Sequence, residues 1–381
     1  MNQKEKILKI RDLDISFKTD NGNVKAVRGV DLDLHRGETI AIVGESGSGK
    51  SVTTKAVMGI LAGNGQINNG TIEFHYADLS PERIQEVIEK YNGVIPEGYT
   101  RPEEQKVVDI TKQSKKFIQS EIRGRRIAMV FQDPMTSLDP TMTIGKQVME
   151  AMRFHYNTPK KEAWKRAVKL LELVGITDAE KRMKNYPHQL SGGMRQRVVI
   201  AIALSCDPEI LICDEPTTAL DVTIQAKILE LIQDIQKKKN LSVIYITHDL
   251  GVVAKVADFV NVMYAGRIIE SGSVNDIFYD PKHPYTWGLL ASLPDVDTSG
   301  DELYTIPGTP PNMIQDIQGD AFAPRNPYAL HIDEKIAPPM FQITPTHRVA
   351  SWLAAPNAPK VDMPADLKAK IEKNKKEAKL V

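Results

Sequence analysis

The sequence has little cysteine, no net charge and no long apolar run. Its two cysteines, Cys206 and Cys213, lie in apolar stretches, which excludes a disulfide framework and favours buried thiols in a reducing cytoplasm. Because 49 Lys and Arg residues balance 49 Asp and Glu residues, the overall charge predicts no attraction to nucleic acid or to anionic lipid. No run approaches the roughly 18 uncharged apolar residues of a membrane-spanning helix, and the first residues lack the apolar segment of a signal peptide. If the protein works at a membrane, we expect it to dock onto other chains.

At 381 residues the chain is long enough for a main domain and an appendage. Short apolar strands are predicted at residues 39–43, 127–131, 210–213, 242–247 and 259–264, mostly separated by helical patterns. Such alternation indicates an α/β fold whose core is a mostly parallel sheet covered on both faces. Leu13, Ile15 and Phe17 instead alternate with polar neighbours before an Asp-Asn-Gly turn, which predicts a half-buried strand in an antiparallel edge sheet.

Three segments stand apart from this pattern. Residues 158–175 predict a helix that Thr158 caps and Gly175 ends, with a buried face made of Ala163, Ala167, Leu170, Leu171 and Val174. Residues 75–123 are unusual, because a helix expected with Ile84, Val87, Ile88 and Tyr91 on one side is followed by a passage with glycine and proline. A solvated surface elaboration is favoured over a regulatory role. After residue 272 the chain is rich in proline, and its lysine-rich residues 366–379 predict a loose or frayed helix.

A glycine-rich loop, residues 44–51 with the sequence GESGSGKS, follows the strand at 39–43 and precedes a helical pattern. This is the phosphate-loop motif in its strand-loop-helix setting, which argues against an ordinary glycine-rich turn. The glycines allow successive N–H groups to point at phosphates, the helix start adds positive charge, Lys50 supplies a full charge, and the Ser51 hydroxyl can ligate Mg²⁺. The predicted ATP contacts are Gly44, Ser46, Gly47, Ser48, Gly49, Lys50, Ser51 and Val52.

Two adjacent carboxylates, Asp214 and Glu215, end the apolar strand at 210–213. Side chains at the carboxyl end of a parallel strand reach the edge where ligands bind. Asp214 is expected to hold Mg²⁺ and Glu215 to accept a proton from the water that attacks the γ-phosphate. An exposed strand end is the alternative, but the phosphate loop already requires a metal.

A second anion cradle is predicted where Ser191, Gly192 and Gly193, within LSGGM, precede the helical run 195–204. Free N–H groups and the helix dipole both favour an anion at such a start. One chain has no use for two phosphate cradles on one ATP, so this cradle would complete the site of a second chain, head to tail. A helix simply capped by Ser191 is the alternative.

The order of GESGSGKS, LSGGMRQR and ILICDEP resembles the ATP-binding subunits of ABC transporters. The resemblance implies that Gln132 ligates Mg²⁺ and touches the attacking water, that His248 contacts the γ-phosphate, and that Phe17 stacks on adenine. It likewise implies ATP-site roles for Gln196 beside the signature and for Asp221 at the dimer interface. Alone, His248 would be a surface cap and Phe17 would be core or edge packing. The implied organisation is an ATP-binding domain at 1–272, with a helical subdomain at about 140–200 and an insertion at about 75–123, and an extension at 273–381.

Narrower similarity lies in HPYT (283–286), IPG (306–308), FAPRNP (322–327) and FQDPMTSLDP (131–140), which look like segments of oligopeptide and dipeptide importers. The resemblance implies an ATPase that uses ATP and Mg²⁺ at the cytoplasmic face of the membrane. Its implied partners are a second ABC ATPase subunit in a heterodimer, two membrane-spanning permease subunits and, indirectly, an extracytoplasmic peptide-binding protein. Many relatives have a cysteine where this chain has Asn326, and no cysteine follows Cys213, so an iron-sulfur cluster is not expected.

Three other kinds of protein share some of these motifs. An ABC ATPase that imports dipeptides, nickel or another small solute would look similar. A soluble ABC protein of DNA repair or ribosomes would carry two cassettes or a long coiled coil, and residues 75–123 lack sustained heptads. A phosphoryl-transfer enzyme would have no use for LSGGM. No nucleic-acid partner is expected.

Overall fold

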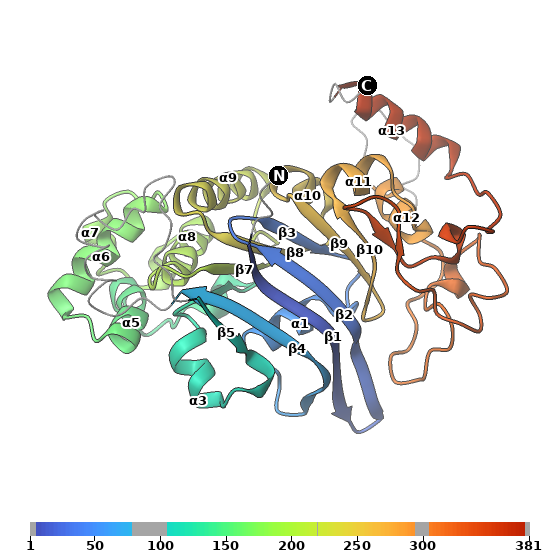
Figure 1. Ribbon diagram of the computed structural model, residues 1–381. Helices are drawn as coiled ribbons and strands as arrows, with labels where there is room; N and C mark the ends of the chain where they lie inside the picture. Colours follow the sequence, from blue (N-terminus) through green and yellow to red (C-terminus); the bar gives the residue numbers. More distant parts are fainter. Residues whose placement is uncertain (1–4, 78–104, 219, 294–304, 378–381) are drawn as a thin grey trace.

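The computed structural model describes residues 5–77, 105–218, 220–293 and 305–377, which form two sheets with flanking helices (Figure 1). The larger sheet has eight strands in the order β11-β12-β10-β9-β3-β8-β7-β6. All pairs from β9 to β6 are parallel, and β10, β11 and β12 are added antiparallel. The bounds are β3 Thr39–Val43, β6 Ile127–Val130, β7 Ile210–Asp214, β8 Ser242–Thr247, β9 Phe259–Tyr264, β10 Arg267–Ser273, β11 Phe341–Gln342 and β12 Arg348–Val349. The five predicted core strands are confirmed, three of them with the predicted bounds.

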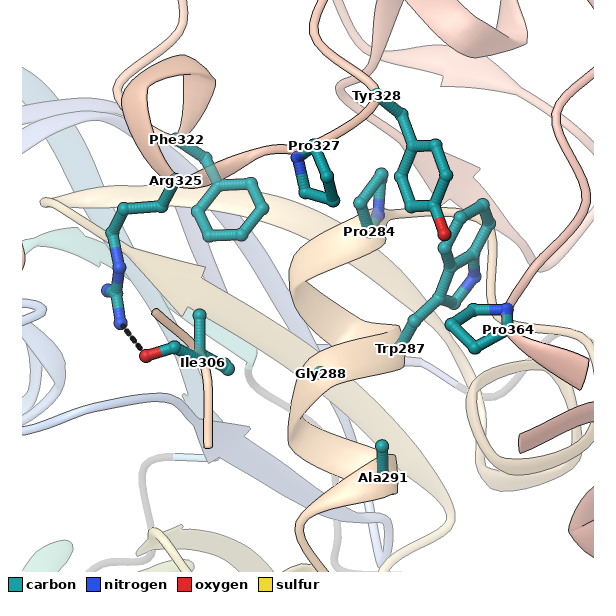
Figure 2. A pocket seen from close by; sticks show the side chains of 10 residues that line it. All are labelled: Pro284, Trp287, Gly288, Ala291, Ile306, Phe322, Arg325, Pro327, Tyr328 and Pro364. Atoms are coloured by element: carbon teal, nitrogen blue, oxygen red, sulfur yellow. Dashed lines mark hydrogen bonds between the residues drawn. The ribbon is translucent and has the colours of Figure 1, made fainter. Parts of the chain in front are cut away.

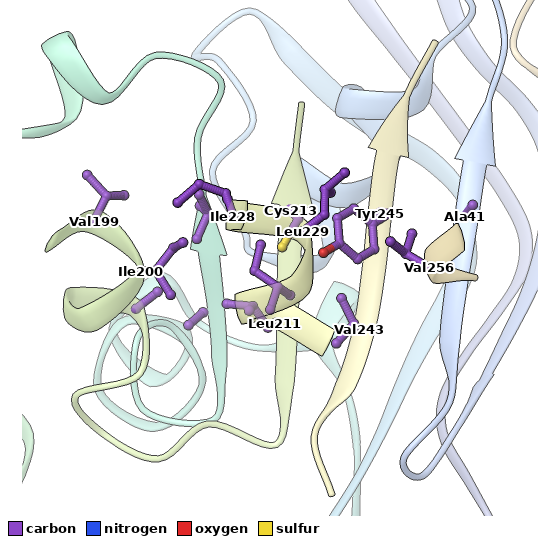
Figure 3. Close-up of a cluster of buried hydrophobic side chains, with 14 of the residues drawn as sticks. Ala41, Val199, Ile200, Leu211, Cys213, Ile228, Leu229, Val243, Tyr245 and Val256 are labelled. Carbon is purple, nitrogen blue, oxygen red and sulfur yellow. The ribbon is translucent and has the colours of Figure 1, made fainter. Parts of the chain in front are cut away.

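Both faces of the parallel sheet are buried, which explains why its strands are apolar throughout. On β3, Ile40 and Ile42 pack into one hydrophobic cluster, and Ala41 and Val43 pack into another on the opposite face. Strands β7 and β8 divide their side chains in the same way, and Figure 3 shows one face, where Tyr245 and its neighbours meet the helices. A strand buried on both faces loses the polar alternation of a surface strand.

The second sheet is antiparallel, with the order β2-β1-β4-β5, and supplies the cluster that contains Ile40 and Ile42. Its strands are β1 Lys6–Thr19, β2 Gly22–His35, β4 Gly65–Ala77 and β5 Gln105–Asp109. The turn at Asp20-Asn21-Gly22 joins β1 to β2, as the sequence pattern predicts. The predicted fold class, a mostly parallel core sheet with an antiparallel edge sheet, is confirmed.

Helices cover the other face of the parallel sheet and continue to one end of the molecule. They are α4 Pro134–Ser137, α5 Ile144–Tyr156, α6 Lys160–Leu173, α7 Ala179–Arg182, α8 Gly192–Ala203, α9 Val222–Lys239 and α10 Leu250–Val256, whereas α1 Lys50–Val57 lies between the two sheets. Helices α5, α6 and α7 gather at the end opposite the C-terminal segments (Figure 1). The predicted helix at 158–175 is confirmed as α6, and Ala163, Ala167 and Leu171 are buried. Thr158 does not cap it, because its hydroxyl donates to the Met152 carbonyl oxygen at 3.1 Å.

The described part of the expected insertion extends the antiparallel sheet. Strand β5 pairs with β4, and the short helices η1 Ile110–Lys112, α3 Lys115–Phe117 and η2 Ile118–Ile122 follow it. Ile110, Ile118 and Ile122 are buried in the cluster between the sheets, so this end of the segment is part of the core. The helix expected around Ile84, Val87, Ile88 and Tyr91 lies outside the described residues.

The C-terminal extension is attached to the main sheet, because β12 pairs with β10. Its helices are α11 Val274–Tyr279, α12 Pro284–Ala291, η4 Ala323–Arg325, η5 Trp352–Ala354 and α13 Ala365–Glu377. The prediction of a loose terminal helix is wrong: Leu367 and Ile371, one turn apart on α13, are both buried, and Lys370 donates to the Leu293 carbonyl oxygen at 2.7 Å. Two apolar residues spaced i, i+4 are enough to fasten a helix that is otherwise lysine-rich. None of the described helices is long and apolar enough to cross a membrane.

Candidate active site

The phosphate loop joins β3 to α1 and is tightly enclosed at two glycines. Gly44 has φ 148°, and a Cβ there would lie 2.0 Å from the Met263 carbonyl oxygen. Gly49 has φ 101°, and a Cβ would lie 2.5 Å from the Ala26 carbonyl oxygen. Only glycine fits both the dihedral angle and the space at these positions. At the middle of the loop, by contrast, Gly47 is exposed and a Cβ would meet nothing within 4 Å.

Lys50 is buried inside the loop, where its Nζ donates to the Gly44 and Glu45 carbonyl oxygens, both at 2.8 Å. Burial lowers the pKa of Lys50, and the carboxylates of Glu215, Asp214 and Glu45 oppose that shift. Of the other predicted contacts, Ser48 is buried, Ser46 is exposed, and Val52 packs partly against the cluster between the sheets. The loop therefore holds an ammonium group where α1 begins without a side-chain cap, and an ammonium group beside a helix N-terminus is an anion-binding arrangement.

Oxygen ligands suitable for a metal meet where α1 begins. The Ser51 hydroxyl donates to Asp214 Oδ1 at 2.9 Å, although the two residues are 163 positions apart. Burial raises the pKa of Asp214, and the hydrogen bond from Ser51 opposes this. A divalent cation would stabilise the ionised form of this carboxylate. Hydroxyl and carboxylate oxygens are also the kind of ligand that Mg²⁺ prefers. The residues present thus fit a magnesium ion.

The three predicted catalytic side chains converge at the end of β7. The Gln132 amide donates to Glu215 Oε2 at 2.8 Å, and His248 Nδ1 lies 3.0 Å from Glu215 Oε1. Thr218, which no sequence pattern marks, also donates from its hydroxyl to Glu215 Oε2, at 3.0 Å. Gln132 therefore contacts the carboxylate of the expected base, and no hydrogen bond among the described residues joins it to Ser51 or Asp214.

Glu215 combines a strained backbone with a carboxylate whose surroundings favour the ionised form. Its φ is 47°, a left-handed conformation that a non-glycine residue rarely adopts. Burial alone would raise its pKa, but the hydrogen bonds and charges around it, those of His248 and Thr218 first, lower the pKa below its ordinary value. A carboxylate fixed in position and kept ionised suits a group that accepts a proton from water.

The signature segment forms a separate surface. Ser191 caps α8, since its hydroxyl oxygen accepts from the Met194 N–H at 3.4 Å, and both Ser191 and Gly192 are exposed. Asp221 similarly caps α9, accepting from the Ile224 N–H at 3.0 Å, and its neighbours Leu220 and Ile224 contact the space beside Gly192 and Gly193. Within the described residues, no hydrogen bond links this surface to the phosphate loop, Asp214 or Glu215.

Two predicted contacts lie elsewhere. Gln196 on α8 is fully buried inside the chain, away from the exposed signature surface, and its amide has no hydrogen-bond partner among the described residues. Phe17 lies on β1 with its ring against Gly65, where a Cβ would approach to 2.6 Å, and it is partly buried against the cluster between the sheets. No hydrogen bond among the described residues links either side chain to the phosphate loop.

Comparison with known proteins accounts for the arrangement. Residues 27–218 match the family described as ABC transporter. The chain belongs to the ABC transporter family. Its resemblance to ABC ATPases, inferred from the order of the motifs, is thereby confirmed. A second match, to the family described as oligopeptide/dipeptide transporter, C-terminal region, covers residues 269–332 of this ABC protein.

Two curated relatives align with this ABC protein over nearly its whole length. It is 54% identical to the oligopeptide transport ATP-binding protein OppD of Bacillus subtilis, over 97% of this chain and 94% of the relative. It is 52% identical to the dipeptide transport ATP-binding protein DppD of Lactococcus lactis, over 94% and 93% of the two chains.

Among solved structures, the ABC protein resembles cbiO1 of Clostridium perfringens, part of the transporter complex cbiONQ, with TM-score 0.55 and 29% identity over 73% of this chain and 92% of that one. The fold is also that of the dimeric cassette MJ0796, solved with ADP and Pi, with TM-score 0.55 and 24% identity over 70% of this chain and 98% of that one.

Proposed function

We propose that this chain is the ATP-hydrolysing subunit of an oligopeptide importer. The observation that carries the proposal is the convergence of Gln132 and His248 on Glu215, one residue beyond the Ser51–Asp214 pair. Phosphate cradle, metal ligands and general base thus occupy neighbouring positions at the carboxyl edge of the parallel sheet, where α/β proteins bind ligands.

Each residue then has a defined task. Lys50 and the loop N–H groups bind the β- and γ-phosphates, Ser51 and Asp214 hold Mg²⁺, and bound Mg²⁺ supplies charge neutralisation at the phosphates. Glu215 accepts the proton of the attacking water, while Gln132 and His248 orient the carboxylate and reach the γ-phosphate. Phe17 is proposed to stack on adenine, and Gln196 is proposed to act at the ATP site beside the signature, as the family resemblance implies.

The second half of each ATP site comes from another chain. Ser191, Gly192 and Asp221 are exposed. They can therefore contact an ATP bound to the phosphate loop of a partner ATPase, so that each ATP lies between two chains related head to tail. To shift the equilibrium between an open and a closed pair of ATPase chains from 1:99 to 99:1, ATP must bind the closed pair more tightly by about 5.5 kcal/mol. Nucleotide held by two charged cradles is a source of that energy, and hydrolysis would release it.

Peptides are the proposed cargo because the relatives with the C-terminal region are oligopeptide and dipeptide transport proteins. Import of nickel or another small solute is the alternative. The working complex would contain a second ABC ATPase, two membrane-spanning permease subunits and, indirectly, an extracytoplasmic peptide-binding protein, with this chain on the cytoplasmic face of the membrane. We retain residues 1–272 as the ATP-binding domain and 273–381 as the extension.

The test is the dependence of ATP hydrolysis on assembly. The full chain, diluted alone, is expected to hydrolyse little ATP, and its specific activity should rise when the companions that co-purify from detergent-solubilised membranes are present. Full activity at high dilution without companions would overturn the shared-site proposal. Uptake of labelled oligopeptides, dipeptides and nickel by cells with and without the Lys50→Ala chain then identifies the cargo, because only the true cargo loses uptake in the variant.

A further inference from the structure

The C-terminal extension contacts the phosphate loop through Glu45, the second residue of that loop. Arg325 at the end of η4 donates from Nη1 to Glu45 Oε2 at 2.8 Å and from Nη2 to Glu45 Oε1 at 3.0 Å. This is a two-point guanidinium–carboxylate pair, which fixes direction as well as distance. It joins residues 280 positions apart.

Arg325 is itself held rigidly by its own surroundings. Its Nε donates to the Pro307 carbonyl oxygen at 2.8 Å, Nη2 to the Ile306 carbonyl oxygen at 3.3 Å, and Nη1 to the Tyr264 hydroxyl at 3.2 Å. Together with the two bonds to Glu45, these use all five donors of a guanidinium. The side chain is 5% exposed, and Figure 2 shows it running from the η4 turn past Phe322 to Ile306. The extension thus holds the Arg325 guanidinium in place for its two-point contact with the Glu45 carboxylate, an arrangement that we call the fork.

A second contact from the extension holds the backbone of the same residue. The Glu45 N–H donates to the Tyr285 hydroxyl at 2.9 Å. Tyr285 lies in the first turn of α12, and its fully buried ring packs against Tyr264 and Phe322, with ring centroids 4.7 and 5.4 Å apart. A hydroxyl at the end of so enclosed a ring has little freedom to follow the loop if the loop moves.

The carbonyl oxygen of Glu45 completes the connection to the ATP site. It accepts from Lys50 Nζ at 2.8 Å and from the Ser48 N–H at 3.2 Å. Every polar group of Glu45 is therefore engaged: its N–H and carboxylate by the extension, and its carbonyl by two residues expected to bind phosphate. A change in how the extension holds Glu45 must alter the direction of that carbonyl and the position of the Lys50 ammonium.

We propose that Arg325 and Tyr285 are positioning residues for ATP, through which the extension holds the phosphate loop in the shape that binds nucleotide. The proposal deepens the function given above and rests on the nucleotide site assigned there. Both residues lie within 269–332, the part that matches the C-terminal region of oligopeptide and dipeptide transporters. The extension consequently takes part in nucleotide binding without touching the nucleotide.

If the Arg325–Glu45 pair only tethered the extension to the rest of the protein, the expected results would differ. The chain contains another ion pair that can serve as the control for this alternative. Lys25 on β2 forms an ion pair with Asp316 of the extension, but both side chains are largely exposed and neither contacts the phosphate loop. Asp316→Asn thus removes a charged link between the same two parts of the protein. A tether would make Arg325 important for unfolding only, whereas a positioning residue changes nucleotide affinity in molecules that remain folded.

The experiment measures the affinity of the full chain for Mg·ADP by calorimetry, the kcat and KM of the assembled ATPase, and thermal unfolding. Arg325→Lys keeps the charge and loses the fork, Glu45→Gln keeps the shape and loses the charge, and Tyr285→Phe removes only the hydroxyl. We expect Arg325→Lys and Glu45→Gln to raise the Kd and the KM for ATP by roughly 2- to 30-fold, the range seen for coupling through intermediate residues, with little change in kcat. Tyr285→Phe should act in the same direction, and Asp316→Asn should leave Kd and KM unchanged.

The double variant Glu45→Gln with Arg325→Lys should bind no worse than the weaker single variant, because both changes break one interaction. Unchanged Kd with a lowered unfolding temperature, or an equal loss of affinity in Asp316→Asn, would overturn the inference. Lys50→Ala separates this failure from failure of the site itself. If Lys50→Ala binds Mg·ADP as the wild type does, the proposed nucleotide site is wrong; if only Lys50→Ala loses affinity, the site stands and the positioning role is wrong.

Discussion

The two helix starts that the sequence marks as anion cradles are built differently. At α1, Gly49 precedes the helix without any side-chain cap, the backbone is packed against Ala26 and Met263, and the extension holds Glu45. At α8, Ser191 caps the helix at the surface, and a Cβ on Gly192 would meet only Leu220, at 3.7 Å. One cradle is enclosed by its own chain and the other is open on its outer side. The difference supports our proposal that the open cradle is completed by a second chain.

The largest effect should come from the base that belongs to the enclosed cradle. Glu215→Gln preserves the size of the side chain but cannot accept a proton, so turnover of the assembled ATPase should fall by roughly 10² to 10⁴-fold. Mg·ADP binding should stay near the wild-type level, because Glu215 does not contact the phosphate loop by any hydrogen bond among the described residues. Steady-state phosphate release and calorimetry measure the two quantities. Wild-type turnover in this variant would refute the assignment.

At the open cradle, Gly192→Asp places a carboxylate where a partner's phosphate is expected. The added Cβ has ordinary space, so the chain should fold normally. Like-charge contact with the γ-phosphate is unfavourable, and we expect turnover of the assembled pair to fall by roughly 10- to 100-fold, which corresponds to about 1.4–2.7 kcal/mol. Binding of Mg·ADP by the chain alone should be unaffected. A loss of binding in the diluted chain would show that both cradles serve one molecule.

A substitution in the enclosed cradle should instead affect the stability and the nucleotide binding of the chain alone. Gly49→Ala forces a Cβ into backbone at a φ of 101°, so it should lower the free energy of unfolding by about 1–3 kcal/mol and weaken nucleotide binding in the chain alone. Gly192→Ala, its control, should change neither the unfolding temperature nor the affinity. Equal behaviour of the two alanine variants would remove the distinction between the cradles.

The same contrast separates what could be predicted from what could not. Strands β3, β8 and β9 and the phosphate loop were predictable because burial on both faces, or one tight turn, leaves a local pattern in the sequence. The contact between Glu45 and Arg325 leaves none, since it joins two distant polar residues in irregular segments. Leu367 and Ile371 did carry a signal, the i, i+4 spacing, which the surrounding lysines obscured. Thr158 met the requirements of a helix cap but bonded backward to Met152, because a hydroxyl takes whichever backbone partner the fold provides.

The smallest expected effect concerns the acid side of the activity profile. Glu215 has its pKa lowered, and the hydrogen bond from His248 is among the causes. A base with a lowered pKa stays ionised until the pH falls through that lowered value, so the wild type should keep its kcat/KM well into the acid range. His248→Gln removes the imidazole that is hydrogen-bonded to Glu215, so the pKa of Glu215 should rise toward its ordinary value and the acid limb of kcat/KM should move to higher pH. Thr218→Val, which removes a hydrogen bond to the same carboxylate without removing a charge, should move the limb in the same direction. Profiles of unchanged shape in both variants would mean that these neighbours orient Glu215 without setting its ionisation.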